Sequence, residues 1–404
     1  MSENRLSDWR EEDYLAANPD VQESVARGEV ADGYTHWVTC GQFEDRPGAT
    51  LKTGAAGTTR YCTDPWINAE FDPDGAVKMC CVNNTHESLD DFADLEQLRQ
   101  AAPFRQLRHD LLTGNLPFAC RACHIRPTVP TQRLVRDICG HDQGRISPLN
   151  PGQLTTARVD INEKCNLRCV YCAVSQPSYV GRQMQDEQMD RLTTILAGYG
   201  GLRALSVNGH GETTHHPRWK EFCRPLLAQG LPLTIITNMG RTLTDEDIDV
   251  LSRFKVIQVS LDMANADLLK RIRRKVDLSR ILYNINMIRT HALLTQGRTP
   301  EFSFSTGLYD LSMQHLEHFA WFTVTLGVAT VTFWNLKQYP DIPGEIRVRA
   351  LDSLEPAALA EALACYDRAM AVLTRFGVKV EVAGGFIDEL KRKLEPVAEE
   401  AVTS

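Results

Sequence analysis

Short apolar runs alternate with longer amphipathic stretches from about residue 157 onwards. The predicted strands are, in chain order, Ala157–Ile161, Ala204–Asn208, Leu233–Thr237, Val256–Leu261, Phe302–Thr306, Thr330–Trp334 and, as one further strand, Val378–Val382. Helices are predicted between them over about 186–196, 218–228, 245–253, 264–292, 312–326 and 355–376. Continuous apolar strands that alternate with amphipathic helices are typical of parallel βαβ units. The pattern therefore predicts an α/β fold, and six such units suit an open, partial barrel.

The segments around this α/β region differ in composition. Residues 1–50 are polar with a helical pattern, and we expect a small N-terminal helical segment. Residues 58–126 are rich in cysteine, and 127–153 form a predicted linker rich in Pro, Gly, Thr and Gln. We expect the barrel to occupy 154–340 and a helical extension to follow over 341–404.

Composition and charge exclude several classes of protein. The chain has 44 Lys and Arg against 52 Asp and Glu, a net charge of −8, which disfavours a general nucleic-acid binder. The polar N-terminus shows no secretory signal, and no stretch suits a membrane span, so we expect a cytoplasmic protein with neither nucleic acid nor membrane as partner. Twelve cysteines in such a chain indicate metal or redox chemistry rather than disulfides.

Three cysteines, Cys165, Cys169 and Cys172, follow the first predicted strand of the barrel. In parallel α/β folds, ligand sites gather at the C-terminal ends of strands. Soft thiolates so close together select an iron–sulfur cluster, zinc or copper(I). Three ligands would leave one iron of a four-iron cluster open for chemistry, whereas a zinc knuckle is the alternative.

This spacing, with the aromatic Tyr171 before the last cysteine, resembles the signature of the radical S-adenosylmethionine (SAM) enzymes. The resemblance implies a partial (β/α)6 radical SAM barrel in which Cys165, Cys169 and Cys172 hold a 4Fe–4S cluster. SAM would bind the open iron and be split by one electron into methionine and a 5′-deoxyadenosyl radical. Tyr171 would contact the adenine through its backbone.

The loops after the next three strands also resemble this family. They read Asn208-Gly209-His210-Gly211-Glu212, Thr237-Asn238-Met239-Gly240 and Ser260-Leu261-Asp262, and a basic stretch containing Arg273 follows. The resemblance implies SAM contacts from Gly211, Glu212, Asn238, Ser260 and Arg273. Glu212 would accept the SAM ammonium, and the Arg273 fork would bind its carboxylate. Met239 departs from the family pattern, which has a glycine there.

Four further cysteines resemble a SPASM or twitch module, which holds auxiliary clusters in many radical SAM enzymes. They are Cys62, Cys80, Cys120 and Cys123, with Cys81 as a substitute for Cys80. The resemblance implies a second 4Fe–4S cluster, and a four-cysteine zinc site is the alternative. The order departs from the family, because this module precedes the barrel instead of following it.

The expected activity is that of a radical SAM oxidoreductase of dehydrogenase or peptide-maturase type. An auxiliary cluster that accepts an electron favours net oxidation of a peptide or a sugar-like small molecule, and Tyr14–Val21 resembles a motif found beside glycan-related enzymes. The expected partner is an electron donor such as flavodoxin or ferredoxin. The alternatives are a redox-neutral epimerase, with Cys223 or Cys139 returning hydrogen, and a non-catalytic iron–sulfur or zinc protein.

Overall fold

The computed structural model describes residues 10–37, 41, 46, 58–83, 86–123, 125–131, 133–134, 154–337, 339, 342–344 and 346–394. The chain divides into two compact units. The first consists of Met1–Arg158 and Asp190–Ala204, and the second of Val159–Met189 and Leu205–Ser404. None of the described helices is both long enough and apolar enough to cross a membrane.

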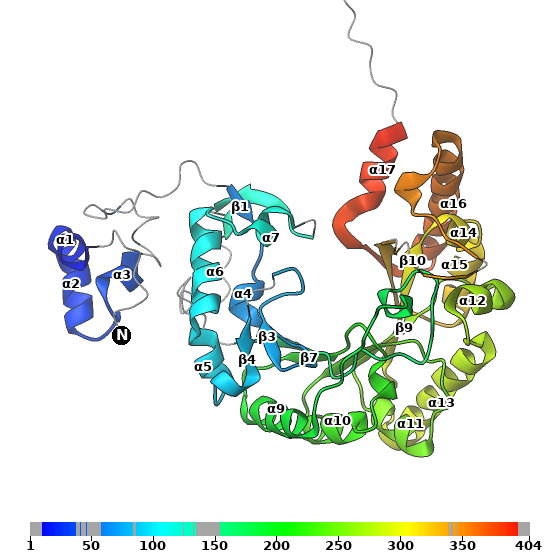
Figure 1. Cartoon of the computed structure of the whole chain (residues 1–404), viewed down its shortest axis with the longest axis horizontal. Coiled ribbons are helices and arrows are strands. Elements are labelled where there is room, and N and C mark those ends of the chain that lie inside the picture. Colours follow the sequence, from blue (N-terminus) through cyan, green and yellow to red (C-terminus); the bar gives the residue numbers. More distant parts are fainter. Residues whose placement is uncertain are drawn as a thin grey trace, which may run out of the picture. The chain divides into compact units, whose positions relative to one another are not determined.

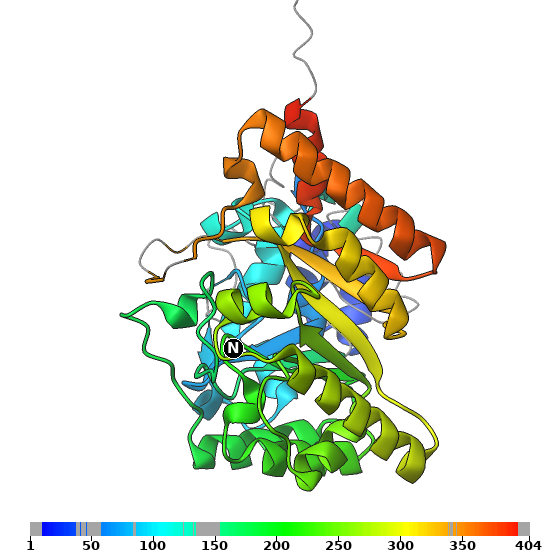
Figure 2. The same ribbon diagram turned by 90° about the vertical axis from the view of Figure 1, so that its right-hand side faces the viewer.

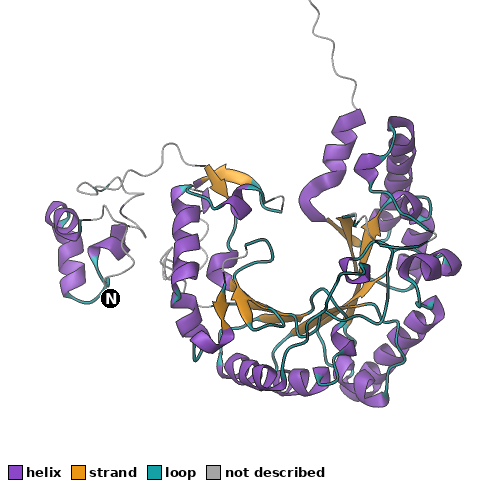
Figure 3. Cartoon of the chain, in the orientation of Figure 1, coloured by secondary structure: helices purple, strands orange, loops and turns teal. Residues whose placement is uncertain are grey.

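A parallel sheet forms the centre of the second unit (Figures 1 and 3). Its strand order is β12–β11–β10–β9–β8–β7, and the recorded pairs are parallel. The strands are β7 (Ala204–Val207), β8 (Leu233–Thr237), β9 (Val256–Ser260), β10 (Glu301–Leu308), β11 (Thr330–Asn335) and β12 (Lys379–Val382). Helices follow the strands along the chain, namely α10 (Trp219–Ala228), α11 (Asp245–Ser252), α12 (Ala266–Arg273), α13 (Leu278–Gln296), α14 (Asp310–Met313), α15 (Leu316–Thr325) and α16 (Pro356–Arg375).

The first β/α repeat is formed by β6 (Thr156–Val159) and α9 (Asp186–Gly198). With it, six strands from β6 to β11 are each followed by helix, which confirms the predicted α/β fold, a partial (β/α)6 barrel. The predicted strands and helices agree with the structure to within a few residues. There are two exceptions. The predicted helix 264–292 is two helices, α12 and α13, and the predicted helix 312–326 is divided between α14 and α15.

The core of the second unit follows from the strand pattern. Buried residues alternate with less buried ones along β8 and β9, as expected for side chains that point to opposite faces of a sheet. Ile257, Val259, Phe304 and Phe333 are fully buried. The Phe333 ring lies 6.0 Å from that of Tyr366 on α16.

Beyond the barrel repeats, the chain continues as β12 and α17 (Phe386–Leu394). Helix α16 packs against α15, and Figure 2 shows α16 and α17 in orange and red. The predicted helix over 355–376 and the further strand over 378–382 are confirmed.

The first unit has a two-stranded sheet, four further strands and several short helices. Strand β1 (Thr58–Arg60) pairs antiparallel with β5 (Thr128–Pro130), which lies in the stretch predicted as a linker. Four further strands have the order β6–β2–β3–β4, with β2 (Asn68–Phe71), β3 (Ala76–Lys78) and β4 (Glu87–Ser88). Its described helices are α1 (Glu11–Ala17), α2 (Pro19–Ala26), α3 (Gly33–His36), α4 (Asp64–Ile67), α5 (Leu95–Gln100), α6 (Ala102–Thr113) and α7 (Phe118–Arg121). Trp66 and Phe104 are fully buried between these elements.

Candidate active site

The cysteine loop follows β6 and begins the site. Cys169 is buried, and Cys165 and Cys172 are partly buried. The Leu167 N–H donates to the Cys165 sulfur at 3.4 Å, and the Cys172 N–H donates to the Cys169 carbonyl at 3.2 Å. These turns hold the three cysteines in one compact loop.

The electrostatics of this loop fit an iron–sulfur cluster. Burial raises the pKa of all three thiols, to about 11 for Cys165. Negative charge on Cys172 or Cys165 raises the pKa of Cys169 as well, so the three sulfurs interact with one another. The raised pKa values mean that the loop by itself favours protonated thiols. A bound cationic centre would favour thiolates instead, because metal ligation deprotonates a thiol. Three adjacent sulfur donors are the ligand set that iron–sulfur clusters use.

The glycine loop after β7 packs directly on the cysteine loop. A Cβ atom on Gly211 would overlap the Asn162 carbonyl oxygen, and one on Gly209 would overlap the Asp160 carboxylate. The Glu212 N–H donates to the Lys164 carbonyl at 3.0 Å. Gly211, predicted to contact SAM, is therefore needed for loop packing in any case.

Glu212 joins the loops after β7 and β8. It is 2% exposed. Its Oε1 accepts from the hydroxyls of Thr214 at 2.7 Å and Thr237 at 2.8 Å, and its Oε2 accepts from the Asn238 N–H at 2.8 Å. A carboxylate oxygen accepts two hydrogen bonds, so Oε2 keeps capacity for a ligand. Its contact with the SAM ammonium stays a prediction.

Asn238 connects this pair of loops to the cysteines. Its Nδ2 donates to Asn166 Oδ1 at 2.9 Å and lies 3.7 Å from the Cys165 sulfur. Met239, the departure from glycine, has a φ of 49°, so methionine adopts the left-handed conformation that glycine favours. The Asn284 amide stabilises this turn by donating to the Met239 carbonyl at 2.9 Å.

Asp262, after β9, is the centre of a buried polar network. Arg273 Nε and Nη2 donate to its two oxygens at 3.0 and 2.8 Å. The hydroxyls of Tyr171 and Tyr309 donate to Oδ2 at 2.6 and 3.2 Å. Burial opposes the charge on Arg273, but the interactions with Asp262, Tyr171 and Cys169 together outweigh it and raise the pKa of the guanidinium. Through Tyr171 the network fixes the cysteine loop to the end of β9.

The structure thus connects most of the predicted site residues by direct hydrogen bonds. Tyr171 and Arg273 meet at Asp262, and Glu212 and Asn238 meet beside Cys165. Ser260, the last residue of β9, is half-buried. Their roles in binding SAM stay predictions.

Several site residues were not expected from the sequence. Asp160 accepts from the N–H groups of Asn162 and His210 at 3.0 Å, and Glu163 forms an ion pair with Arg182. The carboxylates of Asp160 and Glu163 and the His210 ring come within 4.8 Å of one another. In the sequence, these residues could have been found from Asp160, a carboxylate inside a predicted apolar strand. Tyr309 left no comparable signal.

The four predicted auxiliary cysteines lie in the first unit. The Tyr61 N–H donates to the Pro127 carbonyl at 2.9 Å, which continues the β1–β5 pairing toward Cys62. Burial raises the pKa of Cys62 and Cys120, and negative charge on Cys80 raises both further. Cys80 therefore lies within electrostatic reach of both.

Two contacts hold this cysteine group in place. Arg60 Nε donates to the Cys120 carbonyl at 3.1 Å, and the Cys123 N–H donates to the same carbonyl at 3.2 Å. Cys80 is partly buried, whereas Cys81 is exposed. This difference favours Cys80 as the ligand.

The remaining cysteines have no shared site among the described residues. Cys223, one candidate hydrogen donor for an epimerase, is fully buried on α10. Cys365 is partly buried on α16. Cys40 and Cys139, the other candidate donor, lie outside the described residues.

Two curated proteins are similar in sequence to part of this chain. The chain is 27% identical to a GTP 3′,8-cyclase of Brucella abortus over 178 residues, which cover 38% of this chain and 47% of the relative. It is 25% identical over 183 residues to the tungsten-containing aldehyde ferredoxin oxidoreductase cofactor-modifying protein of Pyrococcus furiosus, covering 44% and 50%. The chain spans about half the length of the curated relatives it matches.

A solved structure and a family profile complete the comparison. SuiB of Streptococcus suis, bound to its precursor peptide SuiA, aligns with a TM-score of 0.45 at 13% identity, over 65% of this chain and 56% of that one. Residues 159–322 match the Radical SAM superfamily, a family that implies a 4Fe–4S cluster and SAM. This match covers the cysteine loop and the strands that carry Glu212, Asn238 and Asp262. The chain therefore contains a radical SAM superfamily domain.

Proposed function

We propose that this protein reductively cleaves SAM and uses the resulting radical to abstract hydrogen from a substrate. The cysteine loop carries this proposal, because its three thiols lie in one compact loop that the strand-end residues Asn238 and Asp262 contact. When bound, a 4Fe–4S cluster on Cys165, Cys169 and Cys172 supplies the electron that splits SAM into methionine and a 5′-deoxyadenosyl radical.

The chain's own residues would bind and orient SAM. Glu212 Oε2 offers an acceptor for the ammonium, and Asn238 lies next to Cys165. Arg273 uses Nε and Nη2 for Asp262, which leaves Nη1 to bind the SAM carboxylate. Tyr171 and Ser260 would complete the adenosyl side of the site.

The test is deoxyadenosine formation under anaerobic conditions with dithionite. The reconstituted parent should form 5′-deoxyadenosine, and the variant Cys165→Ala/Cys169→Ala/Cys172→Ala should form none. Glu212→Gln should keep its iron but lose affinity for SAM, because a neutral amide attracts an ammonium less than a carboxylate does. Full iron content without deoxyadenosine in the parent would reject the proposal.

We further propose a second 4Fe–4S cluster on Cys62, Cys80, Cys120 and Cys123. Their mutual electrostatic influence supports a shared centre. A cluster with four protein ligands has no open iron for SAM, but it can accept an electron from a substrate radical. This supports net oxidation or cross-linking of a peptide or sugar-like substrate, the oxidoreductase activity proposed here.

Metal analysis separates this proposal from a zinc site. Two clusters predict about eight irons per chain in the parent and about four in the triple Cys165/Cys169/Cys172 variant. About four irons and one zinc in the parent would assign the four N-terminal cysteines to zinc. Redox-neutral chemistry, such as epimerisation, would then be favoured.

A further inference from the structure

A basic groove lies beside the cysteine loop, with a volume of about 570 Å³. Val170, between two of the cluster cysteines, lines one part of it. Lys270, Arg271, Arg274 and Lys275, at the end of α12, line another. This places four cationic side chains around the residue next to Cys169.

Hydrogen bonds fix the end of α12 to the cysteine loop. The Val170 N–H donates to the Ile272 carbonyl at 2.9 Å, and the Cys169 sulfur lies 3.6 Å from the Arg273 carbonyl. The basic groove is therefore a surface of the same substructure that would hold the cluster.

The positive charge of the groove is not neutralised within the described residues. Lys270, Arg271 and Lys275 are exposed, and none of them forms an ion pair with any carboxylate in the described part of the chain. Some basic residues of the same unit are paired, as Arg253 is with Asp249. On a chain with a net charge of −8, the run from Lys270 to Lys275 is a local concentration of positive charge.

The backbone at the end of α12 is unfavourable for the residues it carries. Arg274 and Lys275 have φ values of 49° and 58°, in the region that favours glycine. Glycine at either position would remove this cost but also a positive charge. Strained backbone of this kind is concentrated at functional sites.

We propose that this groove, called here the donor groove, binds a small acidic electron-donor protein. The inference rests on the proposed function, because only a redox cluster on the cysteine loop needs an external electron. Weak electron-transfer complexes have small interfaces, and complementary charge guides such encounters. The donor groove offers unpaired positive charge at the surface next to the cluster ligands.

The electron balance is simple. The donor's reduced flavin or iron–sulfur centre would lose one electron, and a 4Fe–4S cluster held by Cys165, Cys169 and Cys172 would gain it. No bond forms or breaks in this step, and the donor protein leaves oxidised by one electron.

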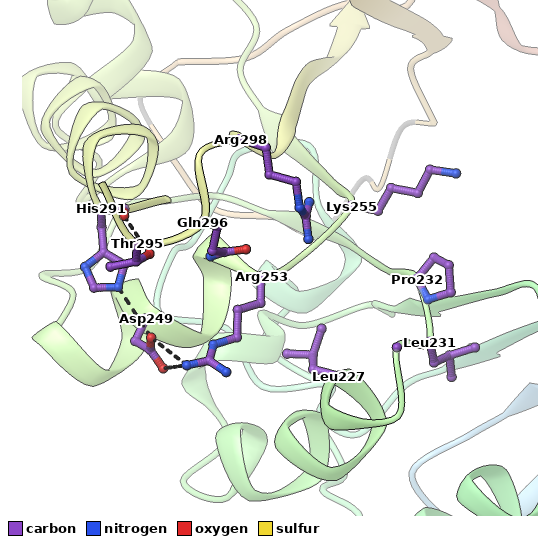
Figure 4. Close-up of a pocket in the computed structure, with 11 residues that line it drawn as sticks. Leu227, Leu231, Pro232, Asp249, Arg253, Lys255, His291, Thr295, Gln296 and Arg298 are labelled. Atoms are coloured by element: carbon purple, nitrogen blue, oxygen red, sulfur yellow. Dashed lines mark hydrogen bonds and ion pairs between the residues drawn. The ribbon is translucent and has the colours of Figure 1, made fainter. Parts of the chain in front are cut away.

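The test compares two double charge reversals in the reconstituted full chain. Lys270→Glu/Arg271→Glu changes the donor groove. Lys255→Glu/Arg298→Glu is the matched control, because both residues are exposed and line a different pocket of about 810 Å³ in the same unit (Figure 4). Both variants lower the net charge by the same amount. The probe is flavodoxin, oxidised for binding and as its hydroquinone for cluster reduction.

We expect the groove variant to bind oxidised flavodoxin about tenfold more weakly and to be reduced correspondingly slower. The control should stay within about twofold of the parent, and dithionite should drive deoxyadenosine formation equally in all three. Parent-like flavodoxin binding in the groove variant, or equal losses in both variants, would overturn the proposal. So would an RNA oligonucleotide that occupies the groove while flavodoxin does not bind.

The binding measurement also separates the two proposals. A parent that binds flavodoxin through the donor groove but forms no deoxyadenosine with dithionite would contradict the proposed function and support the groove.

Discussion

At the scale of single residues, the ion pair of Asp262 and Arg273 is the most buried charged pair of the site. Its side chains are 0% and 5% exposed, and two tyrosine hydroxyls donate to the same carboxylate. Removing one partner of such a pair leaves an unpaired charge in the interior.

We therefore expect Asp262→Asn to lower the free energy of unfolding by about 3–5 kcal/mol. The matched control is Asp249→Asn, which breaks the exposed pair with Arg253 and should cost at most about 1 kcal/mol. Urea denaturation of both variants measures the difference. Similar small losses in the two variants would show that the buried network is not stabilised by the Asp262 charge.

His216 predicts a pH dependence of stability. It is 4% exposed, its Nδ1 accepts from the Arg218 N–H at 3.1 Å, and burial lowers the pKa of the imidazole from 6.5. The unfolded chain then binds a proton more tightly than the folded one. Stability from this group is complete above pH 6.5 and is lost as the pH falls toward the lowered value.

The measurement is the thermal midpoint of the parent and His216→Gln from about pH 5 to 8. The parent should lose more stability than the variant below pH 6.5. Parallel curves would assign the acid sensitivity to other groups.

At the scale of elements, the hydrophobic periodicity predicted the strands and helices of the barrel but not the conformation of its loops. The apolar runs located β8 and β9 because buried parallel strands are short and continuous. The helical pattern over 264–292 did not show the break at Arg274 and Lys275. Neither residue favours a positive φ, so tertiary contacts must hold the backbone in that conformation. Asp262 was expected from a family motif, but its partner Tyr309 lies on another strand end and leaves no local pattern.

The packing of the glycine loop on the cysteine loop gives a prediction at this scale. Gly211→Ala would place a methyl group into the Asn162 carbonyl, so we expect a loss of about 1–3 kcal/mol and reduced iron content. Gly198→Ala at the end of α9 is the control, because no atom lies within 4 Å of its Cβ position. If both alanine variants retain parent stability and iron, the two loops do not need this close contact.

For the whole molecule, the two cysteine sets belong to different compact units. Cys165, Cys169 and Cys172 lie in the second unit, and the four N-terminal cysteines in the first. Both sets were predicted from the sequence, the first from the close spacing of its cysteines and the second from its resemblance to a SPASM or twitch module. The donor groove was not predicted as a site, since the overall charge is negative and the basic run reads equally as a solvated helix face.

Because the two cysteine sets lie in different units, we expect mutations in one set to leave the chemistry of the other intact. In Cys62→Ala/Cys120→Ala we expect about four irons to be lost, while deoxyadenosine formation with dithionite continues without substrate turnover. Iron analysis and product chromatography on one preparation measure both effects. If this variant also loses SAM cleavage, the two centres depend on each other.

The path of the chain between its two units has an evolutionary consequence. The unit boundary is crossed at 158/159, 189/190 and 204/205, so the helix α9 is shared between the units. A recombination event that exchanged residues 1–158 alone would separate them from Asp190–Ala204, the part of the chain with which they form one compact unit. Homologues should therefore inherit the two units together, and changes in α9 should accompany changes in both.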